Sequence, residues 1–239
     1  MPPRVSLILP TYNESGNIMP LIEQSHQYLS PWEHEIIVVD DNSPDGTYDL
    51  VRRSGLPFVR AILREKDPSL ARAIRCGLEN ARGEILVVMD SDFNHRPEDL
   101  SFMVSALDHY DLVIGSRFVY GGSMTSMTRY RLSWLFNIFV RFTTGGSITD
   151  SLSGVFAVKR EILKHLDYDK IFFGYGEYYI RFLYFLQKQK IRIVQFPSAY
   201  GARLAGKGNS AFGKIFVKYS IATIRLAWQQ RVLRHFFKK

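Results

Sequence analysis

Residues 35–46 read EIIVVDDNSPDG, an apolar run that passes directly into acidic and turn-forming residues. A short, continuously apolar run bounded by turn residues is typical of a strand that is buried on both faces of a parallel sheet. Equivalent apolar runs occupy residues 5–9, 59–63, 85–89 and 112–114. We therefore expect these runs to form the strands of a mostly parallel central sheet.

Stretches with helical periodicity separate the expected strands. Apolar residues recur at three- and four-residue spacing from Leu70 to Ala81, which predicts a helix that packs on the sheet and ends at Gly83. Beyond Ser116 the pattern predicts helices over 129–144 and 178–187, and strands near 155–158 and 191–196. This alternation indicates an α/β fold. Because no Ser-, Gly- or Pro-rich linker interrupts the chain, we expect one domain over residues 1–211 and a C-terminal helix over 212–239.

Polar residues follow three of the expected strands. The sequence PTYNE occupies residues 10–14, DDNSPDG occupies 40–46, and DSD occupies 90–92. In open α/β sheets, ligands bind in a crevice outside the carboxyl ends of the strands. We therefore expect these three loops to line one crevice.

The DSD triplet is the strongest chemical signal in the sequence. Two carboxylates at a strand end can chelate Mg²⁺ or Mn²⁺, which in turn bridge phosphate oxygens. Acidic residues after a strand also serve as turn formers or helix caps. On its own, the triplet leaves both interpretations open.

The order of the motifs resembles a known family. VDDNSPDGT at 39–47, PTYNE at 10–14, and ARGE at 81–84 followed by MDSD at 89–92 are similar to the family-2 nucleotide-sugar glycosyltransferases, and among them to the dolichol-phosphate (polyprenyl-phosphate) mannosyltransferases. The resemblance extends over residues 4–210. It implies a Rossmann-like GT-A fold and a divalent metal cofactor, Mg²⁺ or Mn²⁺. It also implies inverting transfer of a hexose, mannose from GDP-mannose, to a polyprenyl phosphate.

The resemblance also assigns roles to individual residues. The donor-binding positions at the first three loops are Pro10, Tyr12, Glu14, Val39, Asp41, Asp90, Ser91 and Asp92. Asp90, Asp92 and Asn94 are the expected metal ligands. The expected phosphate-binding cations are Arg117, Arg131, Arg203 and Lys207, and the expected catalytic residues are Asp92, Arg117 and Arg203. The segment from Asp150 to Ser153-Gly154 matches a further motif of the family.

Two positions depart from the family pattern. Asn209 stands where a lysine usually follows the later arginine, so that Lys207 is the nearest cation. Residues 67–71, DPSLA, replace a glycine-rich stretch. We therefore expect differences in how the loop closes over the donor and in donor or acceptor preference.

The expected reaction needs cations more than a base. A polyprenyl phosphate is already anionic near neutral pH, so its oxygen can attack without a strong general base. Arginine can hold the acceptor phosphate and the leaving diphosphate through paired hydrogen bonds. For Arg129 and Arg131, however, a position on the exposed face of a helix is the competing interpretation.

The charge is unevenly distributed along the chain. Residues 1–177 hold 18 Lys and Arg against all 23 Asp and Glu, whereas residues 178–239 hold 13 Lys and Arg and no acid. A segment with this excess of positive charge is typical of proteins that bind an anionic membrane surface, a phosphate-bearing substrate or nucleic acid. The basic, amphipathic C-terminal helix is therefore a candidate for packing on the core, on a partner or in the plane of a membrane.

The composition of the chain limits the classes of protein to which it can belong. No apolar stretch is long enough for a membrane-spanning helix or a signal peptide, and Cys76 is the single cysteine. We expect a cytoplasmic enzyme that is peripheral on the cytosolic face of a membrane, with a membrane-spanning partner subunit as a further candidate. A UDP-sugar donor is the alternative within the enzyme class. A basic nucleic-acid-binding protein is the alternative outside it, but we expect no nucleic acid partner, because that reading leaves the acidic motifs unexplained.

Overall fold

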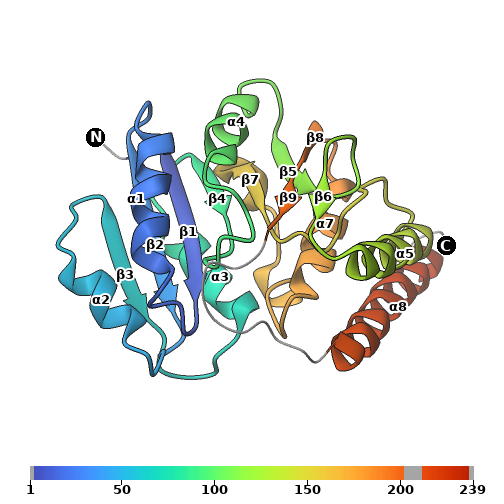
Figure 1. Cartoon of the computed structure of the whole chain (residues 1–239). Helices are drawn as coiled ribbons and strands as arrows, with labels where there is room; N and C mark the ends of the chain where they lie inside the picture. Colours follow the sequence, from blue (N-terminus) through green and yellow to red (C-terminus); the bar gives the residue numbers. More distant parts are fainter. Residues whose placement is uncertain (1–2, 202–211, 237–239) are drawn as a thin grey trace.

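The computed structural model describes residues 3–201 and 212–236. Within them a seven-stranded sheet runs through the molecule with helices on both faces (Figure 1). The strand order is β3-β2-β1-β4-β7-β5-β8, and β7 alone runs antiparallel to its neighbours. The strands are β1 (Val5–Thr11), β2 (His34–Asp40), β3 (Val59–Leu63), β4 (Ile85–Val88), β5 (Leu112–Ser116), β7 (Phe156–Lys159) and β8 (Ile193–Pro197). The expected mostly parallel α/β sheet is confirmed.

The helices are α1 (Ile18–Leu29), α2 (Thr47–Arg53), α3 (Leu70–Asn80), α4 (Asp99–Ala106), α5 (Met127–Thr144), α6 (Arg160–Leu163), α7 (Tyr178–Lys188) and α8 (Phe212–Phe236). A short 3-10 helix covers Tyr168–Lys170, and the strands β6 (Ser123–Met124) and β9 (Ala199–Tyr200) form a separate pair. None of the helices in the described ranges is both long and apolar enough to span a bilayer.

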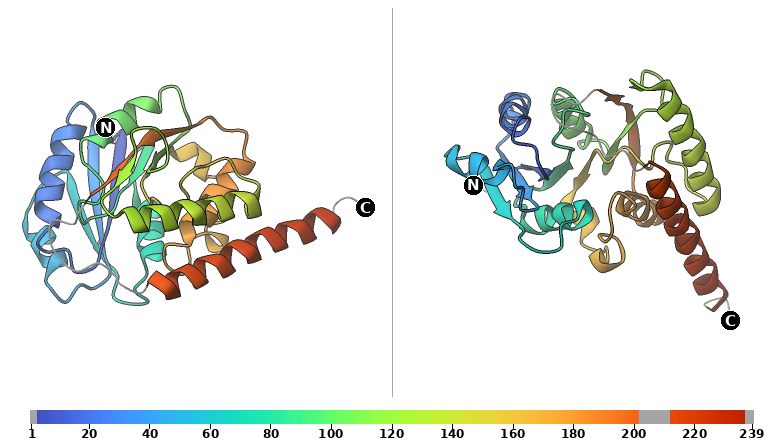
Figure 2. Two further views of the ribbon diagram at one scale, coloured as in Figure 1. Left: turned by 45° about the vertical axis from the view of Figure 1, so that its right-hand side comes forward. Right: turned by 60° about the horizontal axis from the view of Figure 1, so that its bottom comes forward.

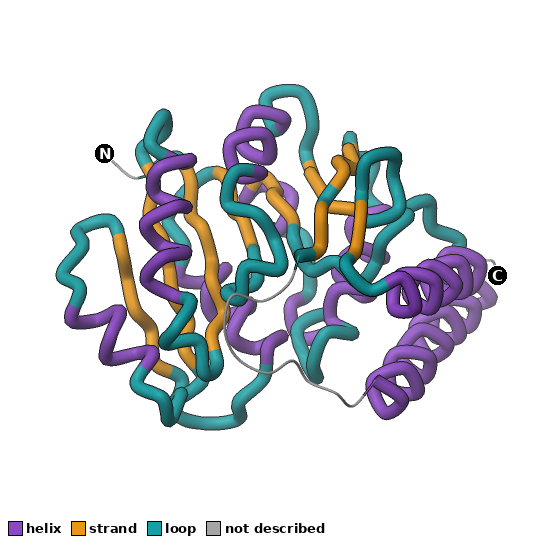
Figure 3. The backbone as a smooth tube through the Cα atoms, in the orientation of Figure 1, coloured by secondary structure: helices purple, strands orange, loops and turns teal. Residues whose placement is uncertain are grey.

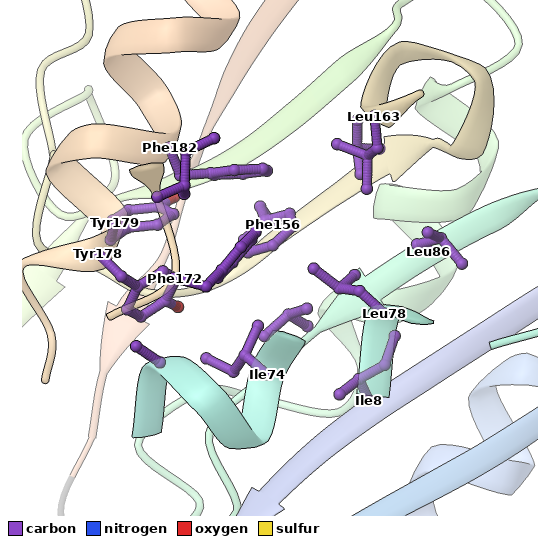
Figure 4. Close-up of a cluster of buried hydrophobic side chains, with 14 of the residues drawn as sticks. Ile8, Ile74, Leu78, Leu86, Phe156, Leu163, Phe172, Tyr178, Tyr179 and Phe182 are labelled. Atoms are coloured by element: carbon purple, nitrogen blue, oxygen red, sulfur yellow. The ribbon is translucent and has the colours of Figure 1, made fainter. Parts of the chain in front are cut away.

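Alternate residues of the central strands point into two hydrophobic layers. One layer joins the sheet to α3 and α7, with Ile8, Ile74, Phe156 and Phe182 among its members (Figure 4). The other joins the sheet to α1 and α4. Since the strands are covered on both faces, they read as continuous apolar runs in the sequence rather than as alternating ones.

The strand order determines where the expected ligand-binding crevice lies. From β1 the chain passes outward to β2 and β3, while β4 lies on the other side of β1. Ligands bind at such a reversal of strand order, outside the carboxyl ends of the strands. The loops that follow β1 and β2 lie at one edge of the sheet, at the bottom of the view (Figure 3).

The helix α3 ends earlier than the sequence pattern predicts. It stops at Asn80, and Ala81 is already extended, so the expectation that it reaches Gly83 is wrong. Gly83 instead lies against β1, where its N–H donates to Ser6 Oγ at 2.8 Å. A Cβ atom at this position would approach the backbone nitrogen of Ser6 to 2.6 Å. Close approach of two backbones, not a helix cap, is therefore the reason for a glycine here.

This contact predicts the effect of adding one methyl group. Gly83→Ala should lower the free energy of unfolding by about 1–3 kcal/mol, because the methyl group meets backbone that cannot rotate away. Gly213→Ala, which places its methyl group in open space on α8, is the matched control and should not destabilise the protein. Urea denaturation of both variants provides the measurement, and equal stabilities would contradict the prediction.

Candidate functional site

Hydrogen bonds join the three polar loops into one site. Ser91 Oγ, after β4, donates to the carbonyl of Pro10 in β1 at 2.8 Å. The backbone N–H of Asn13 donates to Ser43 Oγ at 2.9 Å, which ties the loop after β1 to the loop after β2. The structure thus brings the expected nucleotide-binding loops together at the carboxyl edge of the sheet.

Asp41 organises the side of the site next to β2 and β3. Its carboxylate forms an ion pair with Arg64 and accepts a hydrogen bond from the backbone N–H of Ser69 at 2.6 Å. Burial raises the pKa of the Asp41 carboxyl, although both partners favour the ionised form. Asp41 therefore holds the DPSLA segment in place, and its expected contact with the donor stays a prediction.

Val39, an expected donor-binding position, does not line the crevice with its side chain. Its side chain is fully buried and packs into the layer beneath the sheet, so it presents no surface to a ligand. Tyr12, by contrast, is 56% exposed at the rim of the site. Glu14 is buried and accepts a hydrogen bond from Asn17 Nδ2 at 2.5 Å, at the start of α1.

The two carboxylates of the DSD triplet have different surroundings. Asp90 keeps 31% of its side chain exposed. Asp92 is buried and accepts hydrogen bonds from the backbone N–H of Asn94 at 3.0 Å and from Asn94 Nδ2 at 2.5 Å. Asn94 Nδ2 also donates to the hydroxyl of Tyr200 at 2.9 Å. Asn94 thus supports Asp92 through its nitrogen atoms, and its expected role as the third metal ligand stays a prediction.

The donor set fits a divalent cation that is shared with a substrate. Among the described residues, no three His, Cys, Asp or Glu side chains gather as a metal site. Mg²⁺ is commonly held by only one or two carboxylates, with water and substrate phosphates completing its shell. Gly154 has φ +82°, a backbone conformation that favours glycine, and it lies beside Asp90, because a Cβ atom there would be in ordinary van der Waals contact with Asp90 Oδ1 at 3.8 Å. Asp90 and Asp92 can therefore act as ligands once a diphosphate is present.

His95 is a positioning residue that the sequence reasoning missed. Its ring is completely buried, with Nε2 at 2.9 Å from the carbonyl of Ser153. Burial lowers the pKa of His95 to about 4, so that the ring is neutral at physiological pH and Nε2–H donates to that carbonyl. The only sequence signal was its place three residues after Asp92.

The structure gives Arg117 a different role from the expected phosphate contact. Its guanidinium forms two parallel hydrogen bonds with Asp150, at 2.7 and 2.8 Å, and its backbone N–H donates to the same carboxylate at 3.0 Å. Both side chains are buried. Burial alone would lower the pKa of Arg117, but the charge of Asp150 raises it above its ordinary value. Arg117 therefore positions the 150–154 segment beside Asp90.

The structure describes only one of the three remaining expected cations. Arg131 is exposed on α5. Arg203, Lys207 and Asn209 lie outside the described residues.

A chain of contacts leads from Asp41 to α8. Ser69, whose N–H binds Asp41, donates through its hydroxyl to the carbonyl of Gly174 at 2.5 Å. Glu177 accepts from the backbone N–H of Tyr175 at 3.0 Å and forms an ion pair with Lys218 of α8 at 3.1 Å.

Comparison with known proteins identifies the family of this chain. A family model described as glycosyl transferase family 2 matches residues 6–167. A dolichol-phosphate mannosyltransferase of Pyrococcus furiosus is 30% identical over 97% of this chain, which spans 66% of that protein. An undecaprenyl-phosphate mannosyltransferase of Micrococcus luteus is 35% identical, over 88% of each chain.

The fold also occurs in a solved structure. Glucosyl-3-phosphoglycerate synthase from Mycobacterium tuberculosis, in complex with Mn²⁺, uridine diphosphate and phosphoglyceric acid, superposes with a TM-score of 0.72 at 23% identity. The match covers 94% of this chain and 78% of that one. At this identity the likeness establishes the fold.

The Arg117–Asp150 pair yields a prediction about stability. Asp150→Asn should lower the free energy of unfolding by about 3–5 kcal/mol, because it leaves a buried guanidinium without its counter-charge. The matched control is Asp108→Asn, whose exposed pair with Arg4 should contribute less than about 1 kcal/mol. Urea denaturation measures both values. A loss for Asp150→Asn as small as that of the control would mean that the pair does not hold the 150–154 segment.

Proposed function

Because the chain belongs to glycosyl transferase family 2 and is a glycosyltransferase, we propose that it transfers a hexose to a polyprenyl phosphate at a membrane surface. In this proposal the hexose is mannose and the donor is GDP-mannose. The observation that carries the proposal is the similarity to two polyprenyl-phosphate mannosyltransferases, combined with a partly exposed Asp90 at the reversal of strand order. The enzyme would then be peripheral to the membrane on its cytosolic face.

In this proposal the donor lies across the carboxyl ends of β1, β2 and β4. Tyr12 and Asp41 flank the nucleoside, and Asp90 and Asp92 face the diphosphate. A divalent cation held by these two carboxylates would supply neutralisation of the charge that develops on the leaving diphosphate. Asn94, His95 and the 150–154 segment keep the two carboxylates in place.

The acceptor phosphate needs to be oriented rather than activated. Its oxygen is already anionic, so the protein has to hold it in line with the anomeric carbon and offset the repulsion between two anions. Arg131, Arg203 and Lys207 are the cations proposed for this task. Attack from the side opposite to the leaving diphosphate inverts the anomeric carbon.

A UDP-sugar donor is the second candidate. The structurally similar glucosyl-3-phosphoglycerate synthase is described in complex with uridine diphosphate. An aspartate such as Asp41 can accept hydrogen bonds from either base.

Calorimetric titration with GDP-mannose, UDP-glucose, GDP and UDP, each with and without Mn²⁺, tests the donor. We expect GDP-mannose to bind at least about tenfold more tightly than UDP-glucose, and only when Mn²⁺ is present. Tighter binding of UDP-glucose would establish the alternative donor. Failure of all four ligands to bind would overturn the assignment of the donor site.

Because the two carboxylates of the DSD triplet have different surroundings, we expect substitutions of Asp90 and Asp92 to differ in their effect on stability. Asp90→Asn should reduce transfer about a hundredfold or more, because a neutral amide cannot replace a metal-binding carboxylate, while stability stays nearly unchanged. Asp92→Asn should also abolish transfer but lower stability as well, because its carboxylate is a buried acceptor for Asn94.

Transfer assays at limiting Mn²⁺ and urea denaturation separate these outcomes. Asp49→Asn removes an exposed carboxylate from α2 and is the control for both measurements. Near-normal turnover of Asp90→Asn at limiting Mn²⁺ would contradict its role as a metal ligand.

A further inference from the structure

A pocket of about 1020 Å³ lies between α7, α8 and residues 169–174. Residues of α8 at three- and four-residue spacing, from Lys218 to Gln229, line it, so a single face of this helix forms a wall. The helices α7 and α8 lie side by side (Figure 2) and share one apolar cluster, in which Leu226 of α8 packs. Among the described residues, none of those that line the pocket belongs to the three polar loops, so the pocket is separate from the candidate site.

Apolar side chains make up most of the wall of this pocket. Phe173, Phe185, Ile221 and Trp228 contribute large apolar groups, and Ala222 of α8 is the small residue among them. Three of these large side chains are 46–66% exposed, so the apolar surface is open to a ligand. Pockets of this size, with apolar walls and a few polar groups, are typical of sites that bind small organic molecules.

Arg181 of α7 places a cation in this apolar pocket. The residue is only 5% exposed, and its Cζ atom lies 3.6 Å from the centroid of the Phe173 ring. Nε donates to the carbonyl of Ile171 at 2.9 Å and Nη2 donates to the carbonyl of Phe173, whereas Nη1 forms no hydrogen bond with any described residue. Burial lowers the pKa of Arg181 to about 10, although the charge of Glu177 acts in the opposite direction. Because a buried charge without a counter-charge is unfavourable, an anion bound here would remove that penalty.

The two acids that line the pocket already have partners. Asp169 pairs with Arg75 of α3 at 2.5 Å, and Glu177 pairs with Lys218 at 3.1 Å. Arg225 of α8 is exposed and forms no ion pair with any residue that the structure describes. The pocket therefore retains positive charge that its own carboxylates do not neutralise.

We propose that this pocket binds an amphipathic anion, a molecule that carries a phosphate or carboxylate head on a single apolar chain. The head pairs with the guanidinium groups of Arg181 and Arg225, and the chain lies along the apolar wall. An inorganic anion would leave the apolar wall uncovered, and a neutral chain would leave the buried guanidinium unpaired. Both parts of the ligand are therefore needed for tight binding.

The position of the pocket links such a ligand to the candidate donor site. Arg181 holds the carbonyls of Ile171 and Phe173, and the next residue, Gly174, accepts from the hydroxyl of Ser69. The backbone N–H of Ser69 in turn donates to Asp41. An anion that draws the guanidinium away from these carbonyls would loosen the segment that holds Ser69. We therefore expect the anion to weaken donor binding, and for this meaning the inference rests on the proposed function.

Trp228 lines the pocket and reports on its occupancy. Protein that keeps Trp228, with Trp32 and Trp134 replaced by Phe, would be titrated with decyl phosphate, decanoate, decanol and inorganic phosphate, all below the concentration at which micelles form. We expect the two anionic chains to change the Trp228 emission saturably, with one ligand per chain, and at least about tenfold more tightly than decanol. Inorganic phosphate should leave the emission unchanged, and the tighter of the two anionic chains identifies the preferred head. Equal affinity for decanol and the anions would overturn the proposal.

Two variants separate the pocket from the exposed surfaces of the helices. Arg181→Met removes the buried charge, and Ala222→Phe fills the pocket while the arginine stays in place. Each should weaken binding of decyl phosphate by at least about tenfold. Arg53→Gln removes an exposed arginine from α2 and is the control, which should bind as the original protein does. Urea denaturation checks that each variant folds, and if Arg181→Met does not, Ala222→Phe decides alone: unchanged binding in it would overturn the proposal.

A last pair of measurements separates this pocket from the transfer reaction. Saturating decanoate should weaken GDP-mannose binding about fivefold, and Ser69→Ala should remove this effect while decanoate still binds. Unchanged donor affinity would overturn the link to the donor site. If no nucleotide sugar binds, the proposed function fails, but the Trp228 titration still decides whether the pocket binds an amphipathic anion. Inhibition by decyl phosphate that is purely competitive with the polyprenyl phosphate acceptor, and that Ala222→Phe abolishes, would make the pocket part of the acceptor site and overturn the proposal of a separate one.

Discussion

The buried ion pair between Arg117 and Asp150 is the interaction on which the candidate site depends. Taking two charges out of water is unfavourable unless hydrogen bonds satisfy them well. Here the guanidinium forms paired hydrogen bonds to the carboxylate, which also accepts from the backbone N–H groups of Arg117 and Leu152. The pair fixes the segment that brings Gly154 beside Asp90 and the carbonyl of Ser153 to His95.

Around this pair, some side chains of the site are buried and support their neighbours, and others remain accessible to a ligand. Asp92, Asn94 and His95 are buried and have polar partners, so their positions are set before any ligand arrives. Asp90 and Tyr12 retain exposed surface. Preorganisation of this kind means that binding a charged donor requires little rearrangement of the site itself.

Local sequence patterns predicted the framework, because a strand buried on both faces appears as an apolar run and a loop at its carboxyl end appears as a polar one. The strands near 35–39 and 85–89 and the meeting of their loops follow from this relation. The Arg117–Asp150 pair joins residues 33 positions apart, and no periodicity signals it. Gly83 resembled a helix cap because its contact with Ser6 comes from a distant strand. The exposure of large apolar side chains on α5, such as Phe142, was not predicted, because apolar residues occur on nearly all sides of that helix.

The reversed direction of β7 determines which of its two flanking loops can accept insertions. A parallel strand sends its outgoing loop to the ligand-binding edge, whereas β7 reaches that edge with the segment that precedes it. Chain length before Phe156 is therefore constrained by the geometry around Asp90, while the turn after Lys159 emerges at the opposite edge of the sheet. Over evolutionary time, insertions should accumulate after β7 rather than before it, which is the reverse of the rule for the strands on either side.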